Sequence, residues 1–155
     1  MIFFKKKEDS KKKELIEVLI QNLAVNMKLF SKEYEKANDL LSKSLALVTF
    51  KRWIIKNGKK QKVVDEEYYK LNIEPNDNES AYMLWYKFWH NFFDKGESLL
   101  IEINKKLYVA DSWLIDDTVL YSTKFKEVRI IAPNGTSFKV DKTFDAREVI
   151  YIKLN

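Results

Sequence analysis

The sequence contains no cysteine and a single histidine, His90. The absence of cysteine excludes disulfide bonds, thiol catalysis and cysteine-ligated zinc or iron–sulfur sites. One histidine cannot build a histidine-rich metal centre. Only three glycines and two prolines are present, and neither G-x-G-x-x-G nor G-x-x-x-x-G-K-[ST] occurs. A glycine-rich loop that cradles phosphate groups is therefore excluded as well.

The beginning of the sequence does not have the order of a secretory signal. Its apolar residues come first and Lys5–Lys7 follow, whereas a signal peptide places its basic residues first. The longest uncharged stretch near this end, Val18–Met27, is too short to span a bilayer. We therefore expect a soluble, intracellular chain with no membrane contact.

The composition predicts one folded domain preceded by an arm. The chain has 155 residues, of which 46% are apolar and 14% aromatic, and its net charge is +5. Such a composition builds a packed core and rules out global disorder. Residues 1–14 hold six lysines, which predicts a basic flexible arm. This arm is either a solvated tail or a contact for nucleic acid or an acidic partner, and residues 15–155 are predicted to form a single α+β domain.

Two helices are predicted after the arm. From Lys13 to Phe30, leucines recur every four residues, and Ser31 is a suitable N-cap for a second helix from Lys32 to Val48. The second helix carries one apolar strip, formed by Ala37, Leu40, Leu41, Leu45 and Val48. This spacing predicts that the strip faces the core.

A basic hairpin and an acidic stretch follow. The residues from Leu47 to Ile55 are rich in β-branched and aromatic types, and Asn57-Gly58 is a hairpin turn signal before the return at Lys62–Val64. Residues 51–62 carry six basic and no acidic side chains, whereas Asp65–Glu79 carry six acids and only Lys70. Patches of opposite sign suit docking or self-association, although two solvated loops would have the same composition.

The next predicted helix, Glu79–Asp94, is dominated by aromatic residues. Asn78 or Ser80 can cap its start, and Gly96 can end it. Nine of the twelve residues from Tyr82 to Phe93 are apolar or aromatic. The polar residues Lys87, His90, Asn91 and Asp94 share one narrow face. We therefore expect the helix to be covered on most of its circumference, with its central packing formed by Phe88, Trp89, Phe92 and Phe93.

The rest of the chain is predicted to be a mostly antiparallel sheet of hairpins against which the aromatic helix packs. The first hairpin joins residues 98–103 to 107–110 through Asn104, Lys105 and Lys106. A short helix, Asp65–Leu71, is expected before Pro75. The further strands are expected at 118–121, 126–131, 136–140 and 148–154.

The residues with chemical potential do not assemble into a catalytic pattern. His90 and Asp94 could form an acid–base pair at i and i+4, but a hydrogen-bonded histidine on a buried helix has the same sequence. The clusters Asp65-Glu66-Glu67 and Asp116-Asp117 offer carboxylates for Mg²⁺, yet adjacent acids point in different directions. We predict no enzyme, no catalytic or metal-ligating residue and no cofactor; a small hydrolase or nuclease remains a rival class.

Tryptophans near basic residues leave nucleic-acid binding open as a second interpretation. The four are Trp53, Trp85, Trp89 and Trp113. Aromatic side chains can stack on bases, and lysines can contact phosphates. Three of these tryptophans lie in apolar runs, which favours a core position for them.

The order of the elements resembles a known family. The short helix leads to Leu71–Asn76 with its Pro75-Asn76 pair, the aromatic helix closes at Gly96, and a hairpin and the segment Arg147–Lys153 follow. This order over residues 35–155 resembles the N-terminal part of a tailed-bacteriophage portal protein, the head–tail connector of siphophages. The apolar-then-basic start of the chain is similar too. The sequence departs from the family at Glu97-Ser98, where Asn-Ala is favoured, and at Tyr151, where histidine is frequent.

The resemblance implies a structural subunit of a ring, usually of twelve copies, through which DNA is packaged and ejected. The implied partners are further copies of the chain, the capsid, the terminase, the tail adaptors and DNA bound without sequence specificity. The implied location is the virion, and the host cytoplasm during assembly. Family members are usually more than twice as long, so we expect a wing-like N-terminal fragment or a shortened relative. The alternative function is a small basic nucleic-acid-binding protein.

Overall fold

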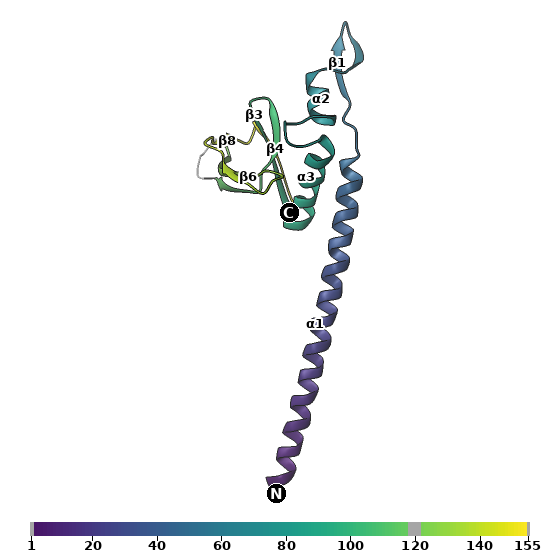
Figure 1. The fold of residues 1–155 in the computed structure, drawn as a ribbon, viewed down its shortest axis with the longest axis vertical. Helices are drawn as coiled ribbons and strands as arrows, with labels where there is room; N and C mark the ends of the chain where they lie inside the picture. The colour runs from purple at the N-terminus through teal and green to yellow at the C-terminus, as the bar shows by residue number, and fades with distance from the viewer. Residues whose placement is uncertain (1, 118–121, 155) are drawn as a thin grey trace. The chain divides into compact units, whose positions relative to one another are not determined.

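A computed structural model describes residues 2–117 and 122–154 of the chain. The chain divides into two compact units, Met1–Ala37 and Asn38–Asn155. The first unit is helical, and the second contains helices and antiparallel sheets, so the predicted α+β class is confirmed. Figure 1 shows the aromatic helix α3 beside β3 and β4 within the second unit.

One continuous helix, α1 (Ile2–Ala46), replaces the two helices predicted on either side of Ser31. The prediction of a break was wrong because residues 2–46 contain neither proline nor glycine, the residues that end helices most strongly. Ser31 is a good cap but does not by itself terminate a helix. The helix also includes residues 2–14, so the predicted basic arm has a helical backbone, and the domain boundary after residue 14 stays a prediction.

The buried face of residues 38–46 is not the predicted apolar strip. Leu40, Leu41 and Val48 are exposed, whereas Asn38, Ser42 and Ala46 are buried. Small side chains allow the backbone of α1 to approach the bulky helix α3. The Asn38 amide donates to the backbone oxygen of His90 over 3.4 Å, and Ser42 donates to Asn38 over 2.9 Å. The strip prediction was wrong because large residues on α3 already fill the space where the two helices meet.

The predicted basic hairpin and short helix are confirmed. Strands β1 (Arg52–Lys56) and β2 (Lys59–Val63) pair in antiparallel fashion around Asn57 and Gly58. Both turn residues have positive φ, 52° and 72°, as a two-residue hairpin turn requires. Helix α2 (Glu66–Asn72) begins at Asp65, whose side chain accepts from the Tyr68 backbone N–H.

The aromatic helix α3 (Ala81–Lys95) has the predicted ends. Ser80 caps its start, and Gly96 closes it in the left-handed conformation with a φ of 75°. The predicted core residues are correct only for Phe88, which is 2% exposed. Trp89 packs against the edge of the core, and Phe92 and Phe93 are half-buried. The central positions belong instead to Leu84 and Trp85, because they share the sheet-facing side of the helix with Phe88.

Two antiparallel sheets follow α3. The first has the order β4-β3-β9, formed by β3 (Glu97–Ile103), β4 (Lys106–Val109) and β9 (Val149–Lys153). The second contains β5 (Ser112–Asp116), β6 (Lys124–Ile131), β7 (Ser137–Lys139) and β8 (Phe144–Asp145), with β6 paired to the other three. The structure confirms the hairpin predicted at 98–110 and the strands predicted at 126–131, 136–140 and 148–154. Strands β5 and β8 were missed. The strand predicted at 118–121 lies outside the described residues.

Strand β3 is the centre of the second unit because both of its faces are buried. Leu100 belongs to a core cluster with Leu84, Trp85 and Phe88 of α3. Leu99 and Ile101 point to the opposite face and join a second cluster with residues of the other sheet, namely Phe125, Val128, Ile130 and Phe144. The second unit is therefore built as helix, sheet and sheet, with β3 in the middle layer.

Candidate functional site

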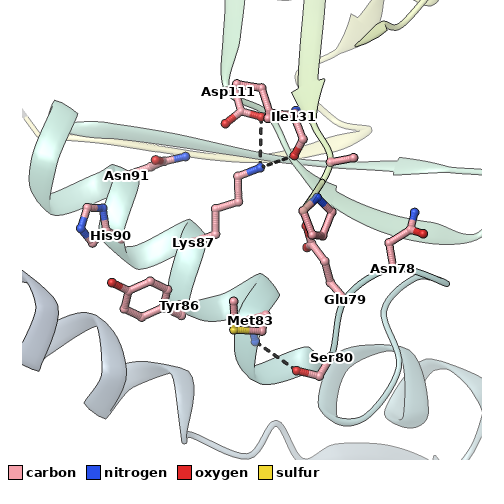
Figure 2. Close-up of a pocket in the computed structure, with 12 residues that line it drawn as sticks. Asn78, Glu79, Ser80, Met83, Tyr86, Lys87, His90, Asn91, Asp111 and Ile131 are labelled. Atoms are coloured by element: carbon pink, nitrogen blue, oxygen red, sulfur yellow. Dashed lines mark hydrogen bonds and ion pairs between the residues drawn. The ribbon is translucent and has the colours of Figure 1, made fainter. Parts of the chain in front are cut away.

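The polar face of α3 borders a recess in the second unit. Lys87, His90 and Asn91 line it together with Asp111 and Ile131, and its volume is about 440 Å³ (Figure 2). The sequence predicted the shared face of the three helical residues. It did not predict Asp111 and Ile131, because they come from distant segments and carry no local motif.

A charged pair occupies one wall of this recess. The Lys87 Nζ atom lies 3.0 Å from Asp111 Oδ2 and donates to the backbone oxygen of Ile131 over 3.2 Å (Figure 2). The same Asp111 oxygen accepts from the Ile131 backbone N–H over 2.5 Å. Both side chains are largely buried, and their partners satisfy them. The pair therefore fixes α3 to the end of β6.

His90 and Asp94 do not form the acid–base pair considered from the sequence. The His90 ring lies 5.5 Å from the Tyr86 ring, centroid to centroid, and Asp94 is exposed. No hydrogen bond joins the two side chains within the described part of the chain. Asp39 accepts a hydrogen bond from the Tyr86 hydroxyl over 3.0 Å. Burial, followed by this hydrogen bond, raises the pKa of Tyr86, the residue whose ring lies beside that of His90.

Asn91 leaves one polar group of the recess wall unsatisfied. The residue is 8% exposed, and its Nδ2 atom is buried with no hydrogen-bond partner among the described residues. A buried unpaired donor is destabilising. It marks the part of the recess where an acceptor group would be most favourable.

The acidic clusters are engaged by basic side chains. Asp65 pairs with Arg52, and a hydrogen bond from that guanidinium holds the carboxyl pKa below its ordinary value. Glu67 and Glu102 both contact Lys70, at 2.9 and 2.7 Å. Burial lowers the pKa of Lys70, but these two hydrogen bonds outweigh it and the pKa is raised.

The carboxylates that the sequence offered as alternative Mg²⁺ ligands are not gathered into one group. Asp116 pairs with Lys126, and the Glu66 Oε1 atom lies 3.8 Å from Lys105 Nζ. Across residues 2–117 and 122–154, no three His, Asp or Glu side chains form a group that could hold a metal ion. Asp65, Glu66, Glu67 and Asp116 therefore act in the structure as partners for lysine and arginine.

The four tryptophans occupy different environments. Trp85 is buried, and its indole N–H donates to the Leu71 backbone oxygen over 2.8 Å. Trp89 and Trp113 pack at the edges of the two cores. Trp53 on β1 is 47% exposed, and Lys60 lies 5.2 Å from the centre of its ring. Only Trp53 has the accessibility that stacking on a base would need.

The hairpin around Trp53 is a second candidate surface. The register places Trp53 opposite Lys62 and Ile55 opposite Lys60, so these four side chains share one face. Arg52 is paired with Asp65, but the hairpin lysines have no acidic partner within the described ranges. The hairpin therefore presents exposed positive charge and an aromatic ring on a two-stranded ribbon.

Comparison with known proteins adds no identity. No family model matches the sequence, and no curated protein matches it. In the parts of the chain that the structure describes, no helix combines the length and apolar content needed to cross a bilayer. A functional assignment therefore depends on the residues themselves.

Proposed function

We propose that the chain is a structural subunit of a bacteriophage portal ring, with residues 38–155 forming a wing-like packing domain. In this role the chain contacts further copies of itself, and the assembled ring passes DNA and docks the capsid, the terminase and the tail adaptors. The observation that carries the proposal is the structural role of Pro75-Asn76, one of the motifs whose order and spacing resemble portal proteins.

This pair anchors the loop between α2 and α3. Pro75 is fully buried, and Asn76 is buried. The Asn76 Nδ2 atom donates to the Leu107 backbone oxygen over 2.8 Å, and the Leu107 N–H donates to the Pro75 oxygen over 2.9 Å. These two hydrogen bonds attach the loop to β4.

The other segments that carry the resemblance are also structural ties. Gly96 ends α3, and its backbone oxygen accepts from the Leu154 N–H over 2.8 Å, just after β9. The Leu71 oxygen accepts from Trp85. The segments Leu71–Asn76, Gly96 and Arg147–Lys153 are far apart in sequence but support one packed unit.

Immunogold labelling of phage particles tests the proposal. In particles released by the strain that encodes this chain, antibodies against residues 38–155 are expected to label a single vertex, where the tail joins. Antibodies against the major capsid protein serve as the control and should label the whole shell. Particles without label, or with label spread over the shell, would refute the portal assignment.

The exposed hairpin supports a second candidate, sequence-independent DNA binding. A two-stranded β-ribbon fits the major groove, and each phosphate that a lysine neutralises releases counterions. We expect the Lys60→Gln/Lys62→Gln variant to bind duplex DNA about tenfold more weakly than the unchanged chain at low salt. The slope of log affinity against log salt concentration should decrease by about 2, close to one unit for each phosphate that is no longer neutralised.

A charge-matched variant controls this experiment. Lys105→Gln/Lys139→Gln removes the same charge from two exposed lysines outside the hairpin. It should keep most of the affinity, as measured by fluorescence anisotropy over a salt series. Equal losses of affinity in the two variants, or no binding by the unchanged chain at low salt, would remove the hairpin as a DNA-binding surface.

A further inference from the structure

The first unit displays an unusual number of apolar side chains to solvent. Along α1, the residues Ile16, Ile20, Leu23, Met27, Phe30 and Tyr34 are between 46% and 76% exposed. Single exposed apolar residues are ordinary, but a continuous row on one helix indicates a contact surface.

The spacing of the row identifies the kind of partner. Successive members alternate between four and three residues apart from Ile16 through Ala37, and the same spacing reaches Leu41 in the sequence. This alternation is the heptad repeat of positions a and d, which keeps one seam facing a partner helix. We call the residues Ile16, Ile20, Leu23, Met27, Phe30, Tyr34 and Ala37 the heptad seam. Its period fits another helix better than a flat surface.

We propose that the heptad seam packs against the same seam of a second copy of this chain, as a parallel, in-register coiled coil. In such a pair, each g position faces the e position five residues further along the partner. Within residues 16–37, the facing pairs are then Leu19 with Ala24 and Asn26 with Ser31. Neither of them brings like charges together, so an identical helix is an acceptable partner.

The charge of this segment disfavours the other occupants. Residues 16–37 contain Lys28, Lys32 and Lys36 against Glu17, Glu33 and Glu35, so their net charge is zero. An anionic membrane surface or a nucleic acid would select a helix with a basic polar face. The seam itself carries no charge, which suits a dry contact between two apolar rows.

The seam pairing deepens the proposed function, on which it rests, by naming a surface through which copies of the chain meet. It does not require a ring, because two or more helices can share the seam without any other contact. Seam dependence and ring size can therefore be measured separately.

Sedimentation equilibrium of the full chain tests the seam. At tens of micromolar the unchanged chain is expected to self-associate, and Leu23→Lys/Phe30→Lys should weaken this association at least about 100-fold by burying charge at two d positions. Val25→Lys/Leu29→Lys is the matched control, since Val25 and Leu29 are 57% and 56% exposed but lie outside the seam. The control should associate like the unchanged chain.

A cysteine scan tests the orientation. Because the chain has no cysteine, Leu23→Cys and Val25→Cys each introduce a single thiol. A parallel, in-register pair brings the two Leu23 positions together, so Leu23→Cys should form a disulfide-linked pair under mild oxidation and Val25→Cys should not. Equal linkage of both variants, or none with Leu23→Cys, would overturn the parallel arrangement.

Further outcomes of these experiments distinguish the seam pairing from the portal proposal. The seam pairing is overturned if the chain stays monomeric at all concentrations. It is also overturned if the monomeric chain binds phosphatidylglycerol vesicles and Leu23→Lys/Phe30→Lys does not. If Leu23→Lys/Phe30→Lys forms a ring and associates as strongly as the unchanged chain, the pairing is overturned but the portal proposal stays intact. Small oligomers that depend on the seam support the pairing even if labelling of particles refutes the portal assignment.

Discussion

Replacing Phe88 by alanine is expected to lower the free energy of unfolding of the second unit by about 3–5 kcal/mol, the usual range for a buried phenylalanine. Phe88 is 2% exposed and lies edge-on to both Trp85 and Trp89, with ring centroids 5.7 and 5.3 Å away. The truncated side chain would leave a cavity that this crowded helix cannot fill by small shifts. Urea unfolding followed by circular dichroism measures the decrease in stability.

Trp89→Ala is the control for this experiment. The sequence alone predicts a similar cost for Trp89, because both aromatic residues lie in the same apolar run. In the structure, Trp89 is half-buried at the edge of the core, so its truncation should cost only about 1–2 kcal/mol. A cost for Trp89→Ala as large as that for Phe88→Ala would show that the helix face has been assigned incorrectly.

Replacing Asn76 by alanine is expected to cost about 2–4 kcal/mol, because it removes two hydrogen bonds in a buried position. The side chain donates to the Leu107 oxygen and accepts from the Asn78 N–H over 2.9 Å. In the variant, the Leu107 oxygen has no donor from this side chain, and the loop is held less firmly on β4. Thermal unfolding measured by calorimetry gives the change.

Asn78→Ala provides the comparison, since Asn78 is exposed and only its backbone N–H bonds to Asn76. Its effect should stay within about 0.5 kcal/mol, as for most surface substitutions. If Asn76→Ala is equally mild, the Pro75-Asn76 pair is not an anchor, and the portal proposal no longer has its main support.

Local signals were sufficient to predict much of the second unit. Asn57-Gly58 determines its own hairpin, since both residues accept positive φ, and Ser80 and Gly96 mark the ends of α3 without reference to the rest of the fold. The polar face of α3 was also predictable, because helical periodicity alone places Lys87, His90 and Asn91 together. These features depend on residues close together in sequence.

Features that depend on tertiary packing were missed or predicted wrongly. The choice of Asn38, Ser42 and Ala46 as the buried face of α1 depends on the bulk of α3, which the sequence of α1 does not contain. The missed strand β5 is held in place by its pairing with β6. The place of Asp111 in the recess was also missed, because its partner Lys87 lies 24 residues earlier in the chain.

The position of β3 has a consequence for how the second unit melts. One strand contributes side chains to both apolar clusters and hydrogen bonds to both β4 and β9. If α3 separated from the sheet, one apolar face of β3 would be exposed to water, although the second sheet packs on the other face of the same strand. Neither the α3 layer nor the second sheet is therefore stable without the other. Heat or denaturant should dismantle them in a single cooperative transition, with the amides of Leu99, Leu100 and Ile101 the last to exchange with solvent.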